Sequence, residues 1–217
     1  MPSLAPDRAS LTAPLTLRAE QVVLEPLAPA HVPALEAAAA DGALWQLSYT
    51  SVPAPGHMAA YVEQALRAQH AGLMLPFAVR ELVDGEVVGS TRYYDIDPAL
   101  PRLAIGYTWY ARRWQQTCLN SACKLLLLEH AFGTIGCVTV AWHTDILNTR
   151  SQQAIARLGA TREGVLRAHK RRVDGSIRDT VCFSMLAAEW PAARVALRQR
   201  VQRLPTVPAT GAPTAGG

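Results

Sequence analysis

This sequence of 217 residues lacks long apolar runs and a strong excess of one charge, and its first residues lack the apolar core that would suggest secretion. The longest apolar segment surrounds Leu125 to Leu128 and falls short of the roughly 18 to 20 residues that cross a bilayer, so the sequence predicts no membrane span. The opening residues contain no continuous apolar core, and we therefore expect a cytoplasmic protein. A net charge of +4 is small for a dedicated nucleic-acid binder and favours an anionic ligand only slightly.

Cysteine is sparse and lacks the paired CxxC spacing of zinc sites and redox motifs. The four positions lie in apolar stretches, and without a secretory leader they are not expected to form a disulfide framework. We therefore predict reduced thiols and no metal site at Cys118, Cys123, Cys137 and Cys182.

Proline is missing between Arg102 and Trp190 but recurs at both ends of the chain. The length fits one domain of roughly 150 residues or somewhat more, with short appendages. Prolines without apolar periodicity predict a mobile arm over residues 1–14, and an uncharged tail rich in Pro, Gly, Ala and Thr predicts disorder over 204–217. The predicted folded domain is residues 15–203.

Apolar periodicity and turn signals predict an alternation of strands and helices along the folded part. Asp-Gly pairs at 84–85 and 174–175 predict two antiparallel hairpins. Asn148 suits the N-cap of a helix whose end is marked by Gly159. This order predicts a layered α/β fold. The expected strands are 22–24, 103–110, 137–144 and those of the hairpins 77–96 and 161–186; the expected helices are 31–40, 58–69, 117–132 and 149–158.

The connection after Tyr110 is polar and basic and leads into a helix that opens near 118–120. Amides at a helix start are unpaired and carry a partial positive charge, which suits a phosphate. Arg112, Arg113 and Lys124 are near enough in sequence to add formal charge. An ordinary helix start with surface side chains is the alternative interpretation.

Three segments together carry a more specific signal: GYTWYARRWQQTCLNSACKLLLLEHAF, CVTVAWHTDILNTRSQQAIARLGATREGVLR and DGSIRDTVCFSML. They resemble the GNAT superfamily of acyl-CoA dependent N-acetyltransferases, and more narrowly the branch of ribosomal-protein N-terminal alanine or serine acetyltransferases. The resemblance covers about 15–190 and implies a mixed, mostly antiparallel sheet with flanking helices, in which the parallel strands 103–110 and 138–144 splay apart. Its strongest part is the fixed spacing of Asp145, Asn148, Arg150, Ser151, Ala154, Ile155, Leu158, Gly159, Ala160, Glu163 and Gly164.

The resemblance also implies a loop that holds the pyrophosphate of acetyl-CoA. Both glycine positions of the family's loop are substituted here, and Cys118 stands at one of them. A thiol at a helix start tends to have a lowered pKa, so the alignment predicts a reactive Cys118. The implied acetyl-CoA contacts are Tyr110, Arg112, Gln115, Gln116, Thr117, Cys118, Leu119, Asn120, Lys124 and Asn148.

Direct transfer in a ternary complex is the chemistry that the resemblance implies, with backbone amides at the end of strand 103–110 as oxyanion donors. Ser151 matches the family's proposed general acid and Glu163 its proposed general base. The alternatives are a serine that supports the helix cap and a solvated strand carboxylate. His143 and His169 are further candidates for the base, because imidazole titrates near neutrality.

The function predicted from the sequence is transfer of acetyl from acetyl-CoA to a primary amine, first of all a protein N-terminus such as that of a ribosomal protein. Acetylation of a small amine, another acyl donor, and a catalytically weak CoA sensor or interaction protein are the alternatives. No direct nucleic-acid contact is expected, and a homodimer is left open. The acceptor would be chosen by residues 41–76 and 165–178, where Trp45, Tyr49 and Tyr61 belong either to its pocket or to the core.

Overall fold

The computed structural model describes residues 11–206, in which eight strands form one sheet in the order β1-β2-β3-β4-β5-β6-β8-β7. Every neighbouring pair is antiparallel except β5 and β6, which are parallel. The predicted fold class is therefore confirmed. The strands are β1 (Leu17–Arg18), β2 (Val22–Pro26), β3 (Met74–Glu81), β4 (Val87–Asp97), β5 (Arg102–Tyr110), β6 (Thr139–Asp145), β7 (Thr161–Arg171) and β8 (Ile177–Leu186).

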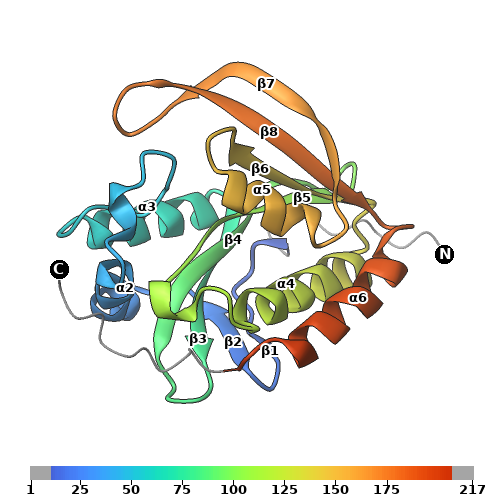
Figure 1. Cartoon of the computed structure of the whole chain (residues 1–217), viewed down its shortest axis with the longest axis horizontal. Helices are drawn as coiled ribbons and strands as arrows, with labels where there is room; N and C mark the ends of the chain where they lie inside the picture. Colours follow the sequence, from blue (N-terminus) through green and yellow to red (C-terminus); the bar gives the residue numbers. More distant parts are fainter. Residues whose placement is uncertain (1–10, 207–217) are drawn as a thin grey trace, which may run out of the picture.

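Helices cover both faces of the sheet (Figure 1). Helices α2 and α3 pack on one face, where they contact β4 and β3, and α4 packs on the other with α6 alongside it. The helices are α2 (Val32–Ala40), α3 (Met58–His70), α4 (Leu119–Glu129), α5 (Thr149–Ala156) and α6 (Trp190–Arg203), with 3-10 turns η1 (Pro29–His31), η2 (Leu44–Gln46) and η3 (Arg112–Trp114) and a π-helical turn η4 (His130–Ile135).

Local turn chemistry predicted several of these elements correctly. Gly85 and Gly175 adopt left-handed φ angles of 77° and 84° in the two hairpin turns. The Asn148 side chain accepts a hydrogen bond from the Ser151 amide as the N-cap of α5. The helix expected over 117–132 is instead α4 followed by η4, and the strand β1 and helix α6 were not anticipated. In α6 only Trp190 and Leu197 are buried, which leaves little apolar periodicity to read.

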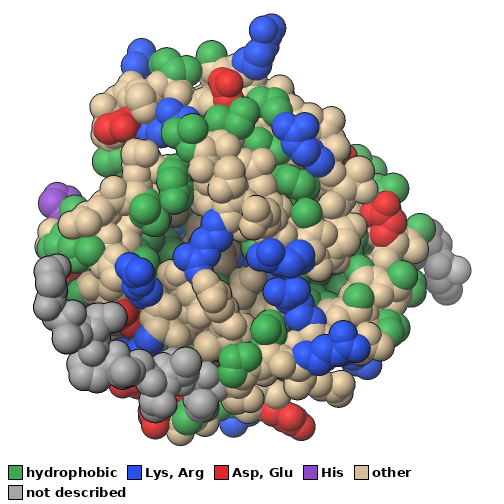
Figure 2. Space-filling model, viewed as in Figure 1, with side chains coloured by type: hydrophobic (Ala, Val, Ile, Leu, Met, Phe, Trp, Pro, Cys, Tyr) green, Lys and Arg blue, Asp and Glu red, His purple; other side chains and the backbone are tan. Residues whose placement is uncertain are grey.

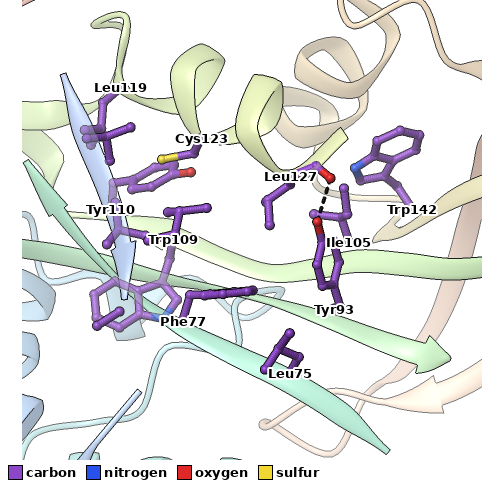
Figure 3. Packing of buried hydrophobic residues seen from close by; sticks show 14 of the residues in the cluster. Leu75, Phe77, Tyr93, Ile105, Trp109, Tyr110, Leu119, Cys123, Leu127 and Trp142 are labelled. Carbon is purple, nitrogen blue, oxygen red and sulfur yellow. Dashed lines mark hydrogen bonds between the residues drawn. The ribbon is translucent and has the colours of Figure 1, made fainter. Parts of the chain in front are cut away.

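Part of the buried hydrophobic core joins α4 to β3, β4 and β5 (Figure 3). Tyr93 of β4 donates its hydroxyl proton to the backbone oxygen of Leu127 over 2.5 Å, and its ring meets Phe77 edge-on. Cys123 lies beside Tyr110 in the same cluster (Figure 3). Because α4 is tied to the middle of the sheet in this way, its first turn is fixed beside the end of β5.

Strands β5 and β6 stay paired only from Arg102–Thr139 to Ala104–Ala141 and then part. A bulge in β5 at Tyr107, whose φ is +51°, shifts the register against β4 and bends the strand away. Gly106 allows this bend, since a Cβ there would lie 2.6 Å from the Tyr94 ring. Within residues 11–206, the backbone groups of β5 beyond Gly106 consequently have no partner strand on the side of β6.

The described ends of the chain belong to the fold. Leu11 is buried, and the backbone oxygen of Thr12 accepts a hydrogen bond from Gln69, so the packed part starts before the boundary expected at residue 15. The rest of the predicted arm and most of the predicted tail, 1–10 and 207–217, lie outside the described residues. Between residues 11 and 206, no helix combines the length and apolar character that a membrane crossing requires.

Candidate active site

The parting of β5 and β6 opens the sheet between its two faces. On the face that carries α4, α5 and α6, basic side chains gather around the hollowed middle, over the region between α4 and α5 (Figure 2). On the face that carries α3, a hollow of about 260 Å³ is lined by Leu73, Met74, Tyr94, Asp95, Ile96 and Tyr107. The site therefore has a basic side and an aromatic side, joined where the strands separate.

His143 of β6 lies on the aromatic side. Its Nδ1 atom is 2.9 Å from the Tyr94 hydroxyl oxygen and 3.7 Å from a carboxylate oxygen of Asp95. Burial lowers the pKa of His143 below its ordinary value, and although Asp95 opposes this shift, nearby cationic groups add to it. Burial also raises the pKa of Tyr94 well above the ordinary value of a phenol. At neutral pH the pair is therefore an uncharged imidazole beside a protonated phenol.

The loop between β5 and α4 is shaped by side-chain hydrogen bonds instead of by glycine. Gln115 donates to the backbone oxygen of Tyr110 over 3.0 Å. Thr117 donates to the backbone oxygen of Trp114 over 2.8 Å and accepts from the Leu119 amide. Gln116 takes a left-handed φ of 68°, which a non-glycine residue adopts rarely. The turn thus keeps a compact form despite the substituted glycines.

Of the other residues predicted to contact acetyl-CoA in this loop, some are exposed and others are buried. Arg112 and Gln116 are exposed, whereas Leu119 is buried. Asn120 accepts a hydrogen bond from the buried Tyr110 hydroxyl over 3.2 Å. Arg113 is engaged in ion pairs with Asp41 and Glu86.

The side chain of Lys124 points into the protein and away from the loop between β5 and α4. Its side chain is buried and its Nζ atom donates to the Thr108 hydroxyl over 2.9 Å. Burial lowers the pKa of this amine to about 8. Helix periodicity turns Lys124 towards the sheet, since it follows Cys123 and precedes Leu127 on the buried side of α4. The prediction that Lys124 adds positive charge at the helix start rested only on its closeness in the sequence.

Cys118 differs from the prediction of a reactive thiol. Its residue is only 1% exposed, and burial raises its pKa above the ordinary value. Its backbone amide donates to the backbone oxygen of Pro205 over 2.9 Å, because the chain leaves α6 across the first turn of α4. The helix start is therefore capped by the C-terminal segment Leu204–Thr206, called the strap below.

Asn148 and Ser151 stand at the start of α5, directly after the end of β6. Asn148 Oδ1 accepts from the Ser151 amide over 2.9 Å, while both side chains remain partly accessible. The turn before them is held by Asp145, whose buried carboxylate accepts from the Leu147 amide and from two nitrogens of Arg172 at 2.7 and 2.9 Å. A buried ion pair thus sets the position of the predicted general acid.

Glu163 lies at a register shift of the edge strand β7 and is exposed. It accepts a hydrogen bond of 2.6 Å from the Ser184 hydroxyl, and its charge raises the pKa of neighbouring Cys182 further after burial. Cys182 is paired with His143 across β8 and β6. Glu163 and His143 therefore share one face of the sheet, separated by the width of β8.

Several aromatic and charged residues of this site were missed or left open by sequence reasoning. No sequence motif marks Arg92, Tyr94 or Asp95. The alternation of side chains along a strand could have suggested only that Arg92 and Tyr94 share a face. Tyr61 of α3 accepts a hydrogen bond from the Trp109 indole over 3.2 Å and so belongs to the site. Trp45 lines a separate hollow of about 310 Å³ between α2 and the segment before α3.

Comparison with known proteins agrees with this geometry. The family described as acetyltransferase (GNAT) domain matches residues 21–161. No curated protein matches the chain. A protein from T. thermophilus assigned as an acetyltransferase is 36% identical, with a TM-score of 0.69 over 86% of this chain and 97% of that one.

Two further structures are similar in fold. A GCN5-related N-acetyltransferase from Brucella melitensis is 26% identical, with a TM-score of 0.79 over 91% of this chain and 87% of that one. RimJ from Mycobacterium smegmatis, solved with CoA-disulfide, is 24% identical, with a TM-score of 0.70 over 86% of this chain and 93% of that one. The open strands, the helix start and the family match together assign acyl-CoA dependent N-acetyl transfer, with acetyl-CoA as cosubstrate. The chain belongs to the GNAT family of acetyltransferases.

Proposed function

We propose that this enzyme acetylates the N-terminal amine of a protein in the cytoplasm. The observation that carries the proposal is the divergence of β5 and β6, which gives an acyl donor and an amine separate approaches to one point. The spacing from Asp145 to Gly164, which resembles that of the ribosomal-protein N-terminal acetyltransferases, supports a protein acceptor. Acetyl-CoA supplies an acetyl group activated as a thioester, and transfer to the amine releases the CoA thiol.

The residues of this chain then have separate tasks. The open backbone edges beyond Gly106 offer hydrogen bonds to an extended donor, and amides at the end of β5 offer donors to a developing oxyanion. Glu163 takes the proton of the acceptor ammonium through water, and Ser151 donates a proton to the departing thiolate. Asn148 holds the start of α5 and contacts the donor with the rest of its amide.

Cofactor binding and acceptor choice can be tested together. At a hundredfold over its dissociation constant, acetyl-CoA should stabilise the fold by about 2.7 kcal/mol, which raises the melting temperature by roughly 5 to 10 °C for a domain of this size. NAD and ATP should act much less. Thiol release is then measured with N-terminal peptides and small amines.

The outcomes separate the alternatives. Turnover of peptides with a defined first residue supports the proposal, whereas turnover of small amines alone replaces it with a small-molecule acetyltransferase. Binding of CoA without thiol release from any amine would indicate a sensor. Failure of calorimetry to detect CoA at millimolar concentration removes the proposal altogether.

The strap should weaken CoA binding, because the Pro205 carbonyl occupies an amide that a pyrophosphate would use. A chain that ends at Leu204 lacks this carbonyl. One hydrogen bond contributes about 0.5 to 1.5 kcal/mol, so the shortened chain should bind CoA roughly two- to tenfold more tightly. Calorimetry gives the affinity, and the alkylation rate of Cys118 should rise at the same time.

Two controls isolate the carbonyl. Thr206→Val changes the neighbouring side chain but keeps the strap backbone, so its CoA affinity should equal that of the full chain. Alkylation of Cys182, which lies on the other face of the sheet, should not depend on the strap. If the shortened chain binds CoA no more tightly, the Cys118 amide takes no part in pyrophosphate binding.

A further inference from the structure

Arg92 of β4 is a buried cation that has no ion-pair partner within residues 11–206. Its residue is 3% exposed, yet its guanidinium forms no ion pair with a carboxylate of residues 11–206. Nη1 donates to the Met74 sulfur over 3.5 Å, and in the described part of the chain Nε and Nη2 have no hydrogen-bond partner. Burying a charge in this way is costly unless something compensates for it.

Two tyrosines supply part of the compensation. The Arg92 guanidinium carbon lies 4.3 Å from the centre of the Tyr61 ring and 4.6 Å from that of the Tyr107 ring. Cation–π contacts of this kind are favourable for the charge and leave the N–H groups in the plane of the guanidinium unused. The unused pair, Nε and Nη2, lies on one edge of the fork, which is the edge that binds a carboxylate through two parallel hydrogen bonds.

This edge belongs to the acceptor side of the site. Met74 and Tyr107, which both touch the guanidinium, also line the 260 Å³ hollow. Asp95 lines the same hollow and lies 3.7 Å from His143 of β6, so the hollow also contains an anionic group. Tyr107, which is 37% exposed and stands on the bulge of β5, both lines the hollow and packs on the Arg92 guanidinium. An amine near Asp95 and a carboxylate near Arg92 would match both charges.

We propose that Arg92 is a specificity-determining residue that binds a carboxylate of the acceptor. The inference rests on the proposed function and names its substrate class: amines that carry a carboxylate close to the amino group, such as a chain that begins with Glu or Asp. The carboxylate takes the Nε and Nη2 edge as the Tyr107 ring shifts, while Tyr61 continues to support the guanidinium from its other face.

Product peptides test this proposal without any need for turnover. Peptides that begin with N-acetyl-Glu and N-acetyl-Gln, otherwise identical, are titrated into the protein in the presence of CoA. The wild-type protein should bind the Glu peptide at least tenfold more tightly. Arg92→Gln should remove the difference, and Arg92→Lys should keep only a part of it, because an ammonium cannot form the two parallel bonds.

Arg80→Gln is the matched control, because Arg80 lies on the neighbouring strand β3 but already pairs with Glu25. It should preserve the discrimination between the two peptides. If Arg92 had only a structural role, its substitution would lower the resistance of the protein to urea but would leave the ratio of the affinities for the two peptides unchanged. Equal affinity of the wild-type protein for both peptides, or binding of neither, overturns the proposal even if no Arg92 variant folds. Acetyl-CoA titrated into the protein without CoA, followed by the thiol-release assay, reports on the proposed function separately.

Discussion

Glu163→Gln is expected to lower the rate of acetyl transfer by about 10²- to 10⁴-fold at neutral pH. The substitution keeps the shape of the side chain and its hydrogen bond from Ser184, but it removes the proton acceptor. An α-amino group has an ordinary pKa of about 7.7 to 8.0, so most acceptor molecules at pH 7 must lose a proton before attack. The deficit should therefore shrink as the pH rises above 8. Initial rates of thiol release from pH 6 to 9 measure this dependence.

Ser151→Ala is the matched comparison for the proton donor. It should lower the rate without changing the acidic limb of the pH profile, since it affects departure of the thiolate and leaves deprotonation of the amine intact. His143→Gln tests the competing base, because the lowered pKa of His143 keeps it neutral and able to accept a proton at pH 7. Nearly full activity of Glu163→Gln across this range, together with a large loss in His143→Gln, would transfer the role of base to His143.

Local chemistry explains which parts of the protein could be predicted from its sequence. The hairpin glycines, the Asn148 cap and the family resemblance of residues 145–164 each depend on residues that are close together in the sequence. Lys124, Arg92 and the strap depend on contacts between distant segments, and no periodicity of their own segments specifies those contacts. Cys118 shows the consequence most clearly. The helix start alone predicts a lowered pKa, but burial beneath the strap raises it.

Asp145→Asn is expected to destabilise the fold by about 3 to 5 kcal/mol, because it leaves the cation of Arg172 without its buried partner. The side chain of Asp145 is fully buried and that of Arg172 is 8% exposed, so solvent compensates little for the lost charge. Urea unfolding at pH 7 measures the change. Asp174→Asn, in the exposed turn between β7 and β8, is the control and should change the free energy of unfolding much less than Asp145→Asn does.

The difference between wild-type and Asp145→Asn stability should also depend on pH in a defined direction. Burial opposes ionisation of Asp145, but hydrogen bonds from Arg172 and the Leu147 amide, with the charges of Arg172 and Arg178, outweigh it and hold the pKa below its ordinary value. A carboxylate with a lowered pKa stabilises the fold fully above its unfolded pKa of about 3.9, and that contribution is lost as the pH falls through the folded pKa. The difference should therefore be constant from about pH 5 to 8 and decrease below about pH 4. A difference that instead grew on acidification would mean that the ion pair with Arg172 does not stabilise the turn that carries Ser151.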